Sequence, residues 1–503
     1  MLLFNNIMDY AFGSLATVHW LFLAFALALA LGFEFINGFH DTANAVATVI
    51  YTNSLPPWVA VIWSGLWNFL GVLGSSGAVA FGIISLLPAD LVMNVGSSAG
   101  FAMVFSMLIS AIIWNLGTWY LGLPASSSHS LIGSIMGVGM MNAYLHTGSP
   151  MSGINWGKAE EVGLALLVSP VVGFFGTAIL FLVTKALLRE PALYVPPVSG
   201  KTPPWWVRGT LCLTCTGVSY AHGSNDGQKG MGLFMLILVG IVPGMYALDL
   251  STNPDSLRQL VTLAQSATSV LARHPETVPM DQTSATAVLG DYLKPGGTFS
   301  AGLFAALNEE NQEIARLLAG HDSLRGVPEN QRGELRSAIY LTAETIEKLS
   351  KNHKLSASEA GGWLKYKGAL DKTTKYIPAW VKAVVALVLG LGTMMGWKRI
   401  VITVGEKIGK AHLTYAQGAS AELVAMITIG LADKYGLPVS TTHVLSSGVA
   451  GAMAANKSGL QMQTLRNLVL AWVLTLPMCV FMGAMFFAAG LLLVAHSSGM
   501  ATH

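Results

Sequence analysis

The chain is organised by long runs of apolar residues that are separated by short polar stretches. A helix needs roughly 20 residues to cross the hydrocarbon core of a bilayer, and these runs reach or exceed that length. They cover residues 17–50, 57–87, 100–120, 160–187, 206–249, 378–402, 411–434 and 465–494. The pattern therefore predicts an all-α, polytopic membrane protein.

Two of these runs, 17–50 and 206–249, are too long for one span and are interrupted by polar residues. We expect both to be broken helices, because irregular backbone at membrane depth is tolerated where it is buried in protein or faces water. Run 57–87 is also long and contains several glycines, so we expect it to tilt or break.

A hydroxyl-rich motif occurs twice. Residues 122–133 read GLPASSSHSLIG and residues 436–447 read GLPVSTTHVLSS, with six of twelve positions identical. Each copy opens a short segment between two apolar runs, at 122–141 and at 436–456. We expect these segments to form two re-entrant hairpins.

An aspartate motif precedes each hydroxyl motif. Residues 38–45 read GFHDTANA and residues 223–230 read GSNDGQKG, which aligns Asp41 with Asp226. His129 follows Asp41 by 88 residues, and His443 follows Asp226 by 217 residues. The longer spacing in the second half is explained by a hydrophilic stretch near 251–377. The chain is thus interpreted as an internal duplication. An odd number of crossings in each half predicts two inverted-topology repeats, with about ten crossings in all.

These boundaries divide the chain into five parts. We assign residues 1–187 to the first transmembrane repeat, 188–205 to a cytoplasmic linker, 206–249 to the start of the second repeat, 250–377 to a hydrophilic helical insert and 378–503 to the remainder of the second repeat.

The distribution of charge predicts an orientation. Charged residues make up 11% of the chain, against about a quarter in soluble proteins. Cytoplasmic loops are enriched in Lys and Arg, and two connections fit: one contains Arg189, Lys201 and Arg208, the other Lys398, Arg399, Lys407 and Lys410. We therefore expect a cell inner membrane protein with both termini and the insert in the periplasm. The first basic residue is Lys158, so we expect no cleaved signal peptide and a retained first span near 17–36.

The hydroxyl motifs have the chemistry of an anion site. Pro124 and Pro438 favour the first turn of a helix, where backbone N–H groups are free. A helix N-terminus attracts anions, and the adjacent hydroxyls add donors without fixed charge. We therefore expect the two copies to be the halves of one oxyanion site.

The aspartates are the expected counterpart of the anion. A carboxylate at bilayer depth costs several kcal/mol, so Asp41 and Asp226 are candidates to hold a cation or exchange a proton. His40 beside Asp41 suggests a proton relay, because an unperturbed imidazole titrates near pH 6.5.

Four more ionisable residues are expected in supporting roles, namely His129, His443, Glu34 and Glu422. The two histidines follow the hydroxyls and are interpreted mainly as structural residues. Cys212 and Cys215 lie in an apolar run, and we expect them to be packing residues rather than a redox or metal pair.

With these motifs the chain resembles the inorganic phosphate transporter family. That family carries two G-x-N-D-x-A-N-A type signatures and two P-x-S-[ST]-[ST]-H type hairpins, arranged as inverted repeats. The resemblance covers 17–249 and 378–494, and it is greatest to the bacterial low-affinity, proton-coupled members. Those proteins move phosphate as a neutral complex with a divalent metal.

The resemblance implies roles for individual residues. Phosphate would be bound by Ser126, Ser127, Ser128, Ser440, Thr441 and Thr442, and the cation by Asp41, Asn44, Asn225 and Asp226. It also implies that a proton travels with phosphate, together with Mg²⁺, Ca²⁺ or Zn²⁺ held by Asp41 and Asp226. No permanently bound cofactor and no nucleic-acid partner are expected, the surroundings are membrane lipid, and a homodimer stays open.

Three residues depart from the family signatures. His40 replaces an Asn in the first copy, and Gln228 and Lys229 replace Ala-Asn in the second. In sodium-coupled relatives these positions help to coordinate the ion. Because an ammonium group could take the cation's place and His40 can titrate, we expect proton coupling rather than sodium coupling.

Several other functions remain as alternatives. A sulfate permease is less favoured, because sulfate carries no proton to donate to the aspartates at neutral pH. A carrier of bare metal should show more carboxylate or sulfur ligands, and a passive channel would not need buried carboxylates. A Ser/His hydrolase is also unfavoured, because catalysis needs one asymmetric site rather than two copies. We therefore expect a transporter and not an enzyme.

Overall fold

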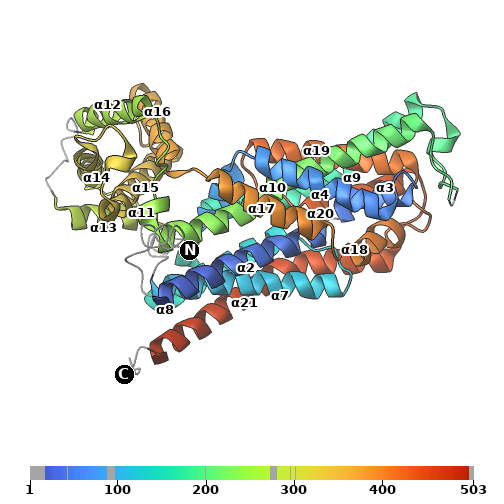
Figure 1. Cartoon of the computed structure of the whole chain (residues 1–503), viewed down its shortest axis with the longest axis horizontal. Helices are drawn as coiled ribbons and strands as arrows, with labels where there is room; N and C mark the ends of the chain where they lie inside the picture. Colours follow the sequence, from blue (N-terminus) through green and yellow to red (C-terminus); the bar gives the residue numbers. More distant parts are fainter. Residues whose placement is uncertain are drawn as a thin grey trace, which may run out of the picture.

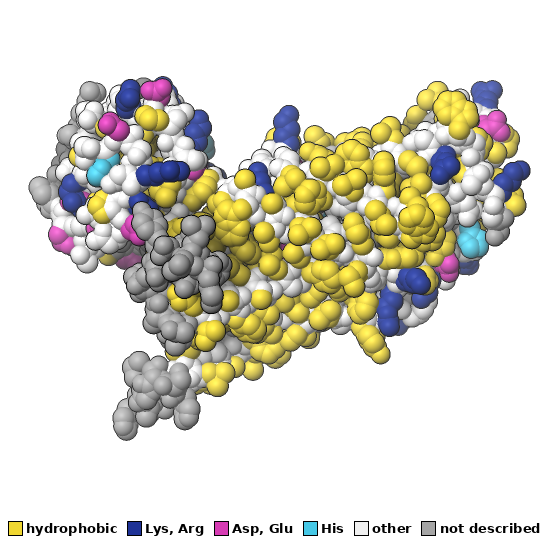
Figure 2. Space-filling view, in the orientation of Figure 1, with side chains coloured by type: hydrophobic (Ala, Val, Ile, Leu, Met, Phe, Trp, Pro, Cys, Tyr) yellow, Lys and Arg dark blue, Asp and Glu magenta, His cyan; other side chains and the backbone are white. Residues whose placement is uncertain are grey.

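The computed structural model describes residues 17–41, 43–87, 97–198, 200–271, 280–294, 296–300 and 302–497. These residues form a long bundle of helices with a separate helical cap at one end (Figure 1). Figure 2 shows hydrophobic side chains covering the middle of the bundle, while Lys and Arg gather on the cap and at the opposite end. This distribution is that of a protein embedded in a bilayer.

The first part of the bundle contains α2 (Thr17–Asp41), α3 (Ala43–Tyr51), α4 (Pro57–Gly74), α5 (Ala78–Ile84), α7 (Ser98–Tyr120), α8 (Ser127–Thr147), η1 (Pro150–Gly153) and α9 (Trp156–Leu187). Beyond η2 (Pro191–Leu193), α10 (Trp205–Ile241) returns along the bundle. The second part contains α17 (Ala379–Thr393), α18 (Lys398–Ile402), η4 (Thr403–Lys407), α19 (Tyr415–Lys434), α20 (Thr441–Ala455) and α21 (Met462–Ser497).

The hydrophilic insert folds into the cap. Its helices are α11 (Pro243–Tyr246), α12 (Pro254–Leu271), α13 (Gln282–Leu293), α14 (Leu303–Leu318), η3 (Leu324–Gly326), α15 (Glu329–Lys351) and α16 (Ala357–Thr374). Apolar side chains such as Leu260, Leu307, Ile339 and Tyr366 form a buried core inside it. The cap therefore has a hydrophobic core distinct from those of the bundle.

Five helical stretches of the described chain are long and apolar enough to span a bilayer: Trp20–Tyr51, Pro57–Gly74, Ala99–Tyr120, Trp156–Leu187 and Met462–Val494. A sixth would combine α16 and α17, which are bent by 69° where the cap joins the bundle. The other long bundle helices carry the polar motifs, which lower their hydropathy. Inverted repeats and about ten crossings stay predictions.

The predicted helix breaks are only partly present. Run 57–87 breaks as expected, because Gly77 adopts a left-handed φ of 87° between α4 and α5. Run 206–249 breaks at Val242, between α10 and α11. The break expected at its polar motif is wrong, because α10 is continuous through that motif and is 37 residues long. In the first run the structure is helical on both sides of residue 42, which lies outside the described residues.

Glycines bring α4 and α10 close together and explain why α10 needs no break. A Cβ on Gly223 would collide with the backbone of Asn68, and a Cβ on Gly227 with the Val72 side chain. The polar side chains of α10 therefore find partners on neighbouring helices instead of on an unwound backbone.

The two hairpins are present, each as an extended stretch followed by a helix. Pro124 and Pro438 lie in the extended stretches, before the helix caps Ser126 and Ser440, so their expected place in the first turn is wrong. Each hairpin helix packs tightly on a long helix through glycines: Gly137 of α8 on Val480 of α21, and Gly451 of α20 on Phe174 of α9. These contacts hold both hairpins inside the bundle.

Hydrogen bonds gather the basic connections at the end opposite the cap. Arg208 Nε donates to the Ser54 carbonyl at 2.8 Å, and Arg399 Nη1 donates to the Tyr120 carbonyl at 2.6 Å. Lys185 Nζ donates to Asn456 at 2.9 Å. One end of the bundle is thus basic and the other carries the cap (Figures 1 and 2).

Candidate substrate and cation site between the hairpins

The N-termini of α8 and α20 meet inside the bundle. Ser126 and Ser440 cap the two helices, each accepting a hydrogen bond from the backbone N–H of the following histidine, at 3.2 and 3.1 Å. The rings of His129 and His443 lie 4.7 Å apart, centroid to centroid. Ser128 Oγ donates to the Val439 carbonyl at 2.9 Å, which joins the hairpins directly.

Hydroxyls from both hairpins converge on Asp41 at the end of α2. Ser127 Oγ lies 3.0 Å from Asp41 Oδ2 and 2.6 Å from Asn37 Oδ1. Thr442 Oγ1 of the other hairpin donates to Asp41 Oδ1. All four side chains are buried. The two hydroxyl motifs therefore share one carboxylate, as the prediction of a single site requires.

Asp226 on α10 is paired with a cation. Lys229 Nζ lies 2.6 Å from Asp226 Oδ1 and also donates to Ser128 Oγ. The ammonium group is fully buried and thus connects the aspartate of the second half to the hydroxyls of the first hairpin.

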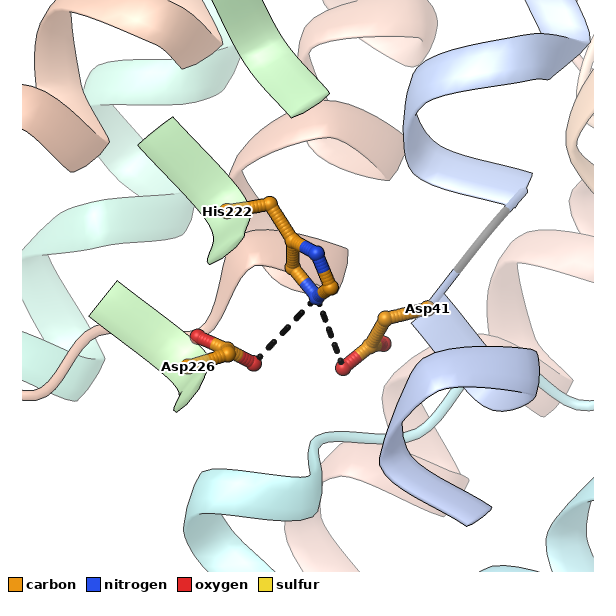
Figure 3. Close-up of side chains that lie close together, drawn as sticks. All are labelled: Asp41, His222 and Asp226. Atoms are coloured by element: carbon orange, nitrogen blue, oxygen red, sulfur yellow. Dashed lines mark ion pairs between the residues drawn. The ribbon is translucent and has the colours of Figure 1, made fainter. Parts of the chain in front are cut away.

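His222 completes the centre and was not predicted from the sequence. Its Nε2 lies 3.5 Å from Asp226 Oδ2 and 3.8 Å from Asp41 Oδ2, between the two carboxylates (Figure 3). Its Nδ1 lies 2.6 Å from Asn68 Oδ1. Because an amide oxygen only accepts, Nδ1 carries a proton and Nε2 of a neutral ring presents a lone pair to two carboxylates. A metal ion or a further proton would neutralise that repulsion.

These three residues also satisfy the geometry of a cation site. One ligand atom from each of Asp41, His222 and Asp226 lies within 4.8 Å of the others, and all three residues are buried. The sequence held one signal for the histidine: aligning Gly38 with Gly223 places His222 opposite Asn37, a residue of the same centre.

Several buried polar atoms around this centre have no hydrogen-bond partner in the described part of the chain. They include Asn37 Nδ2, Asn225 Oδ1 and Thr441 Oγ1. Buried polar groups are rarely left unpaired, so these donors and acceptors are candidates to contact a bound ligand.

The two halves use their motifs unequally. Ser127 bonds to Asp41, but its counterpart Thr441 has no hydrogen-bond partner among the described residues, while Asp226 pairs with Lys229. Lys229 stands where the first half has Asn44, whose side chain lies outside the described residues. The lysine therefore breaks the symmetry of the site.

Other predicted residues lie around the centre. His40 Nδ1 is 3.7 Å from Asp41 Oδ1, and its Nε2 is 3.2 Å from Thr118 Oγ1, so the predicted histidine–aspartate neighbours are in contact range. Asn225 Nδ2 donates to the Leu437 carbonyl of the second hairpin at 3.1 Å. Both residues thus border the hairpin tips.

Gln228, which departs from the family signature, bonds to two neighbouring helices. It accepts from the Val79 N–H at 2.9 Å and donates to Asp433 Oδ1 at 2.5 Å. These bonds join α5, α10 and α19, so Gln228 serves as a structural bridge and its bonds go away from the two carboxylates of the centre.

Two further glutamates, Glu34 and Glu422, are buried. Glu422 accepts hydrogen bonds from Thr48 and, at 2.5 Å, from Thr214. Glu34, seven residues before Asp41 on α2, is fully buried, and neither of its oxygens has a hydrogen-bond partner within the described chain.

The comparisons with known proteins agree on the family. The sequence profile described as the phosphate transporter family matches residues 37–483. The chain is 41% identical over 482 residues to the low-affinity inorganic phosphate transporter PitA of Escherichia coli K12, covering 92% of this chain and 95% of the relative. It is 40% identical over 489 residues to a low-affinity inorganic phosphate transporter of Buchnera aphidicola, covering 95% and 98%.

A solved structure supports the fold. A chain titled the sodium-dependent phosphate transporter superimposes with a TM-score of 0.51 at 18% identity, covering 94% of this chain and 99% of that one. The family match, together with several helices long and apolar enough to span a bilayer, makes this an integral membrane protein. The profile match spans most of the chain, and on that ground the protein belongs to the phosphate transporter family.

Proposed function

We propose that this protein carries inorganic phosphate across the membrane by binding it between the two hairpin tips. The observation that carries the proposal is the meeting of Ser127 and Thr442, one hydroxyl from each hairpin, at the Asp41 carboxylate. The relatives named as phosphate transporters support the same substrate. The protein is not an enzyme.

The polar groups of the centre suit a protonated phosphate. Hydroxyls and the Lys229 ammonium donate to phosphate oxygens, and a carboxylate accepts from a P–OH group. Sulfate has no proton to offer at neutral pH and would face unpaired carboxylates. The site thus favours phosphate over sulfate.

The cluster of Asp41, His222 and Asp226 supports transport of phosphate together with a divalent cation. Two carboxylates and an imidazole are ligands that Mg²⁺, Ca²⁺ or Zn²⁺ accept to different degrees. The metal would be cargo, neutralising the phosphate as it crosses the low-dielectric region. The co-transported ion is then a metal held between phosphate and these side chains.

Proton coupling is supported by two residues. Lys229 already provides a positive charge beside Asp226, which leaves less need for sodium there. His40 places an imidazole beside Asp41, with Nδ1 3.7 Å from Asp41 Oδ1. The second candidate is sodium coupling, and the observation that favours it is the fold shared with a solved transporter titled as sodium-dependent.

The hydrolase alternative has no support in the geometry. Ser126 accepts a bond from the backbone of His129, and no Ser or Thr hydroxyl of the described chain is hydrogen-bonded to the ring of His129 or His443. A Ser–His pair, which nucleophilic catalysis needs, is therefore missing there.

Uptake of ³²P-labelled phosphate into proteoliposomes tests the proposal. Proton and sodium gradients are imposed separately, with Mg²⁺ present or removed by a chelator. We expect uptake that follows the proton gradient and falls when the metal is removed. Uptake driven by sodium alone would overturn the coupling, and absence of uptake in every condition would overturn the substrate.

The proposed orientation places the cap and both ends of the chain in the periplasm. It rests on the basic connections at the far end of the bundle (Figure 2). To test this orientation, a cysteine is introduced at Glu334, an exposed position of the cap. Intact spheroplasts are then treated with a membrane-impermeant thiol reagent, and labelling of this cysteine is measured. Labelling only after lysis would reverse the orientation.

A further inference from the structure

A second cavity lies between the cap and the bundle. It has a volume of about 880 Å³ and is lined by α15 of the cap, the start of α9, the short helix α5 and the end of α10. It is separate from the hairpin tips, which line none of it.

The charged residues that line this cavity are mainly basic. Its cations are Lys158, Lys294, Arg336, Lys348, Lys351 and Lys375, and its anions are Glu161, Glu344 and Glu347. The carboxylates are already engaged, because Glu161 pairs with Lys158 at 3.0 Å, Glu344 with Lys375 at 3.1 Å and Glu347 with Lys351 at 2.9 Å. The unbalanced charge that faces the cavity is therefore positive.

Arg336, like Lys348, is a lining cation that forms no ion pair with a carboxylate of the described chain. Its guanidinium lies 5.9 Å from the centre of the Tyr340 ring, and no acceptor among the described residues takes a hydrogen bond from it. Lys348, in contrast, donates to three backbone carbonyls, at 2.5, 3.3 and 3.1 Å. A guanidinium has five donors that match the geometry of phosphate, and here they lie free at the wall of a cavity.

The floor of the cavity borders the second hairpin. Gly82 of α5 packs against Gly436, which lies in the turn that opens that hairpin. A Cβ added to Gly82 would lie only 3.2 Å from the Gly436 carbonyl oxygen. Val79 of the same helix is bonded to Gln228 of α10. A single short helix thus separates the cavity from the hairpin that carries Thr442.

We infer that this cavity is a second anion site, which holds a phosphate group through Arg336 on the cap side of the transport site. The inference rests on the proposed function for the identity of the transported anion. Free phosphate and the phosphate of an anionic lipid headgroup share the chemistry that Arg336 recognises. Occupancy by free phosphate raises its local concentration beside the second hairpin.

The binding test uses ³¹P line broadening of inorganic phosphate by the full-length protein in a phosphate-free maltoside detergent. Arg336→Gln removes the charge, Arg336→Lys retains it, and Arg258→Gln is a matched control because Arg258 is exposed and remote from the lining. We expect Arg336→Gln to lose at least half of the broadening and the other two variants to keep it. Equal broadening by wild type and a correctly folded Arg336→Gln would overturn the inference.

A lipid arm separates the two sources of the anion. Phosphatidylglycerol and phosphatidylcholine are added separately. If only phosphatidylglycerol removes the Arg336-dependent broadening, the lipid headgroup is an occupant of the site. If neither lipid removes it, free phosphate is the occupant. Either result supports a phosphate site at Arg336.

Transport kinetics provide an independent reading. In proteoliposomes of phosphatidylcholine, Arg336→Gln should raise the apparent KM for phosphate about three- to tenfold with kcat within twofold of wild type, and high salt should remove the difference. Absence of uptake by wild type together with Arg336-dependent broadening would reject the transport function alone. If wild type takes up phosphate and Arg336→Gln has the same KM and the same line broadening as wild type, only the cavity site is rejected.

Discussion

Thr442, at the tip of α20, donates a hydrogen bond to Asp41, a residue 401 positions earlier at the end of α2. The bond connects a hydroxyl of the second hairpin to the carboxylate of the first aspartate motif. Ser127 of the first hairpin reaches the other oxygen of the same carboxylate. Asp41 is therefore the residue at which both halves of the chain meet.

Replacing Thr442 with Val keeps the shape of the side chain and removes the donor. A hydrogen bond to a charged group is worth about 1.5–3 kcal/mol, so phosphate uptake should fall about tenfold to a hundredfold. The matched control is Ser447→Ala on the same helix, because Ser447 Oγ bonds only to the Val444 carbonyl of its own helix. Uptake by Thr442→Val within twofold of the control would contradict a role for this hydroxyl.

The variant His222→Asn gives the second half the same residue as its aligned counterpart in the first half, Asn37. Loss of the imidazole should favour hard cations over Zn²⁺, because imidazole suits zinc, whereas carboxylate and amide oxygens suit Mg²⁺ and Ca²⁺. We expect the ratio of Zn²⁺- to Mg²⁺-supported uptake to fall about tenfold. His40→Asn, outside the three-residue cluster, should leave that ratio unchanged. An unaltered ratio in His222→Asn would rule out imidazole as a metal ligand.

Lys229→Ala removes the counter-ion of Asp226 and leaves a buried carboxylate unpaired. Breaking a buried ion pair in this way costs about 3–5 kcal/mol, so uptake should fall at least tenfold. Sodium, which binds at a carboxylate, should restore part of it. The double variant Lys229→Ala/Asp226→Asn should not respond to sodium. If sodium stimulates the single variant no more than wild type, the lysine does not stand in for a cation.

Glu34 is a candidate proton carrier, because it is a buried carboxyl whose oxygens have no hydrogen-bond partner in the described chain. Gln has nearly the same shape and cannot titrate. Glu34→Gln should keep the exchange of internal for external phosphate but lose accumulation driven by a proton gradient. Measuring both in the same vesicles decides the point, since accumulation equal to wild type would exclude Glu34 from coupling.

The cap should loosen in acid. Burial by itself would raise the pKa of Glu347, but ion pairs with Lys351 and Lys367, both at 2.9 Å, lower that pKa to about 2. A lowered carboxyl pKa stabilises the fold above the ordinary value near 4.5, and this stability is lost as the pH falls towards 2.

Cleavage by pepsin within α15 and α16 measures this loss. Glu347→Gln should be cut faster than wild type at pH 4.5, and the ratio of the two rates should approach one as the pH falls to about 2. Glu334→Gln, on the exposed side of α15, is the control. A ratio that does not change with pH would show that Glu347 does not stabilise the cap.

The parts of the site that consist of short motifs of neighbouring residues could be predicted from the sequence. The hydroxyl motif could be recognised because it occurs twice. Its two copies meet at Asp41, as expected if they form the two halves of one site. His222 was not predicted because it lies one residue before the aligned aspartate motif 223–230, and a single histidine has no signature of its own. It joins the site through the fold, which brings α10 against α2 and α4.

The error over α10 has the same origin. A run of polar residues and glycines in a long span looks like a break when only the neighbours in sequence are considered. In the structure, Gln228 bonds to α5 and α19, and glycines admit the backbone of α4. Tertiary contacts supply the partners, so the helix continues.

The tight packing of α8 on α21 has a consequence for how the protein is made. The ribosome delivers α8 long before α21, so the glycines of the first hairpin helix lack their α21 partner until that helix has been made. An unfinished copy therefore carries an unsupported hairpin with buried-type hydroxyls exposed in the bilayer.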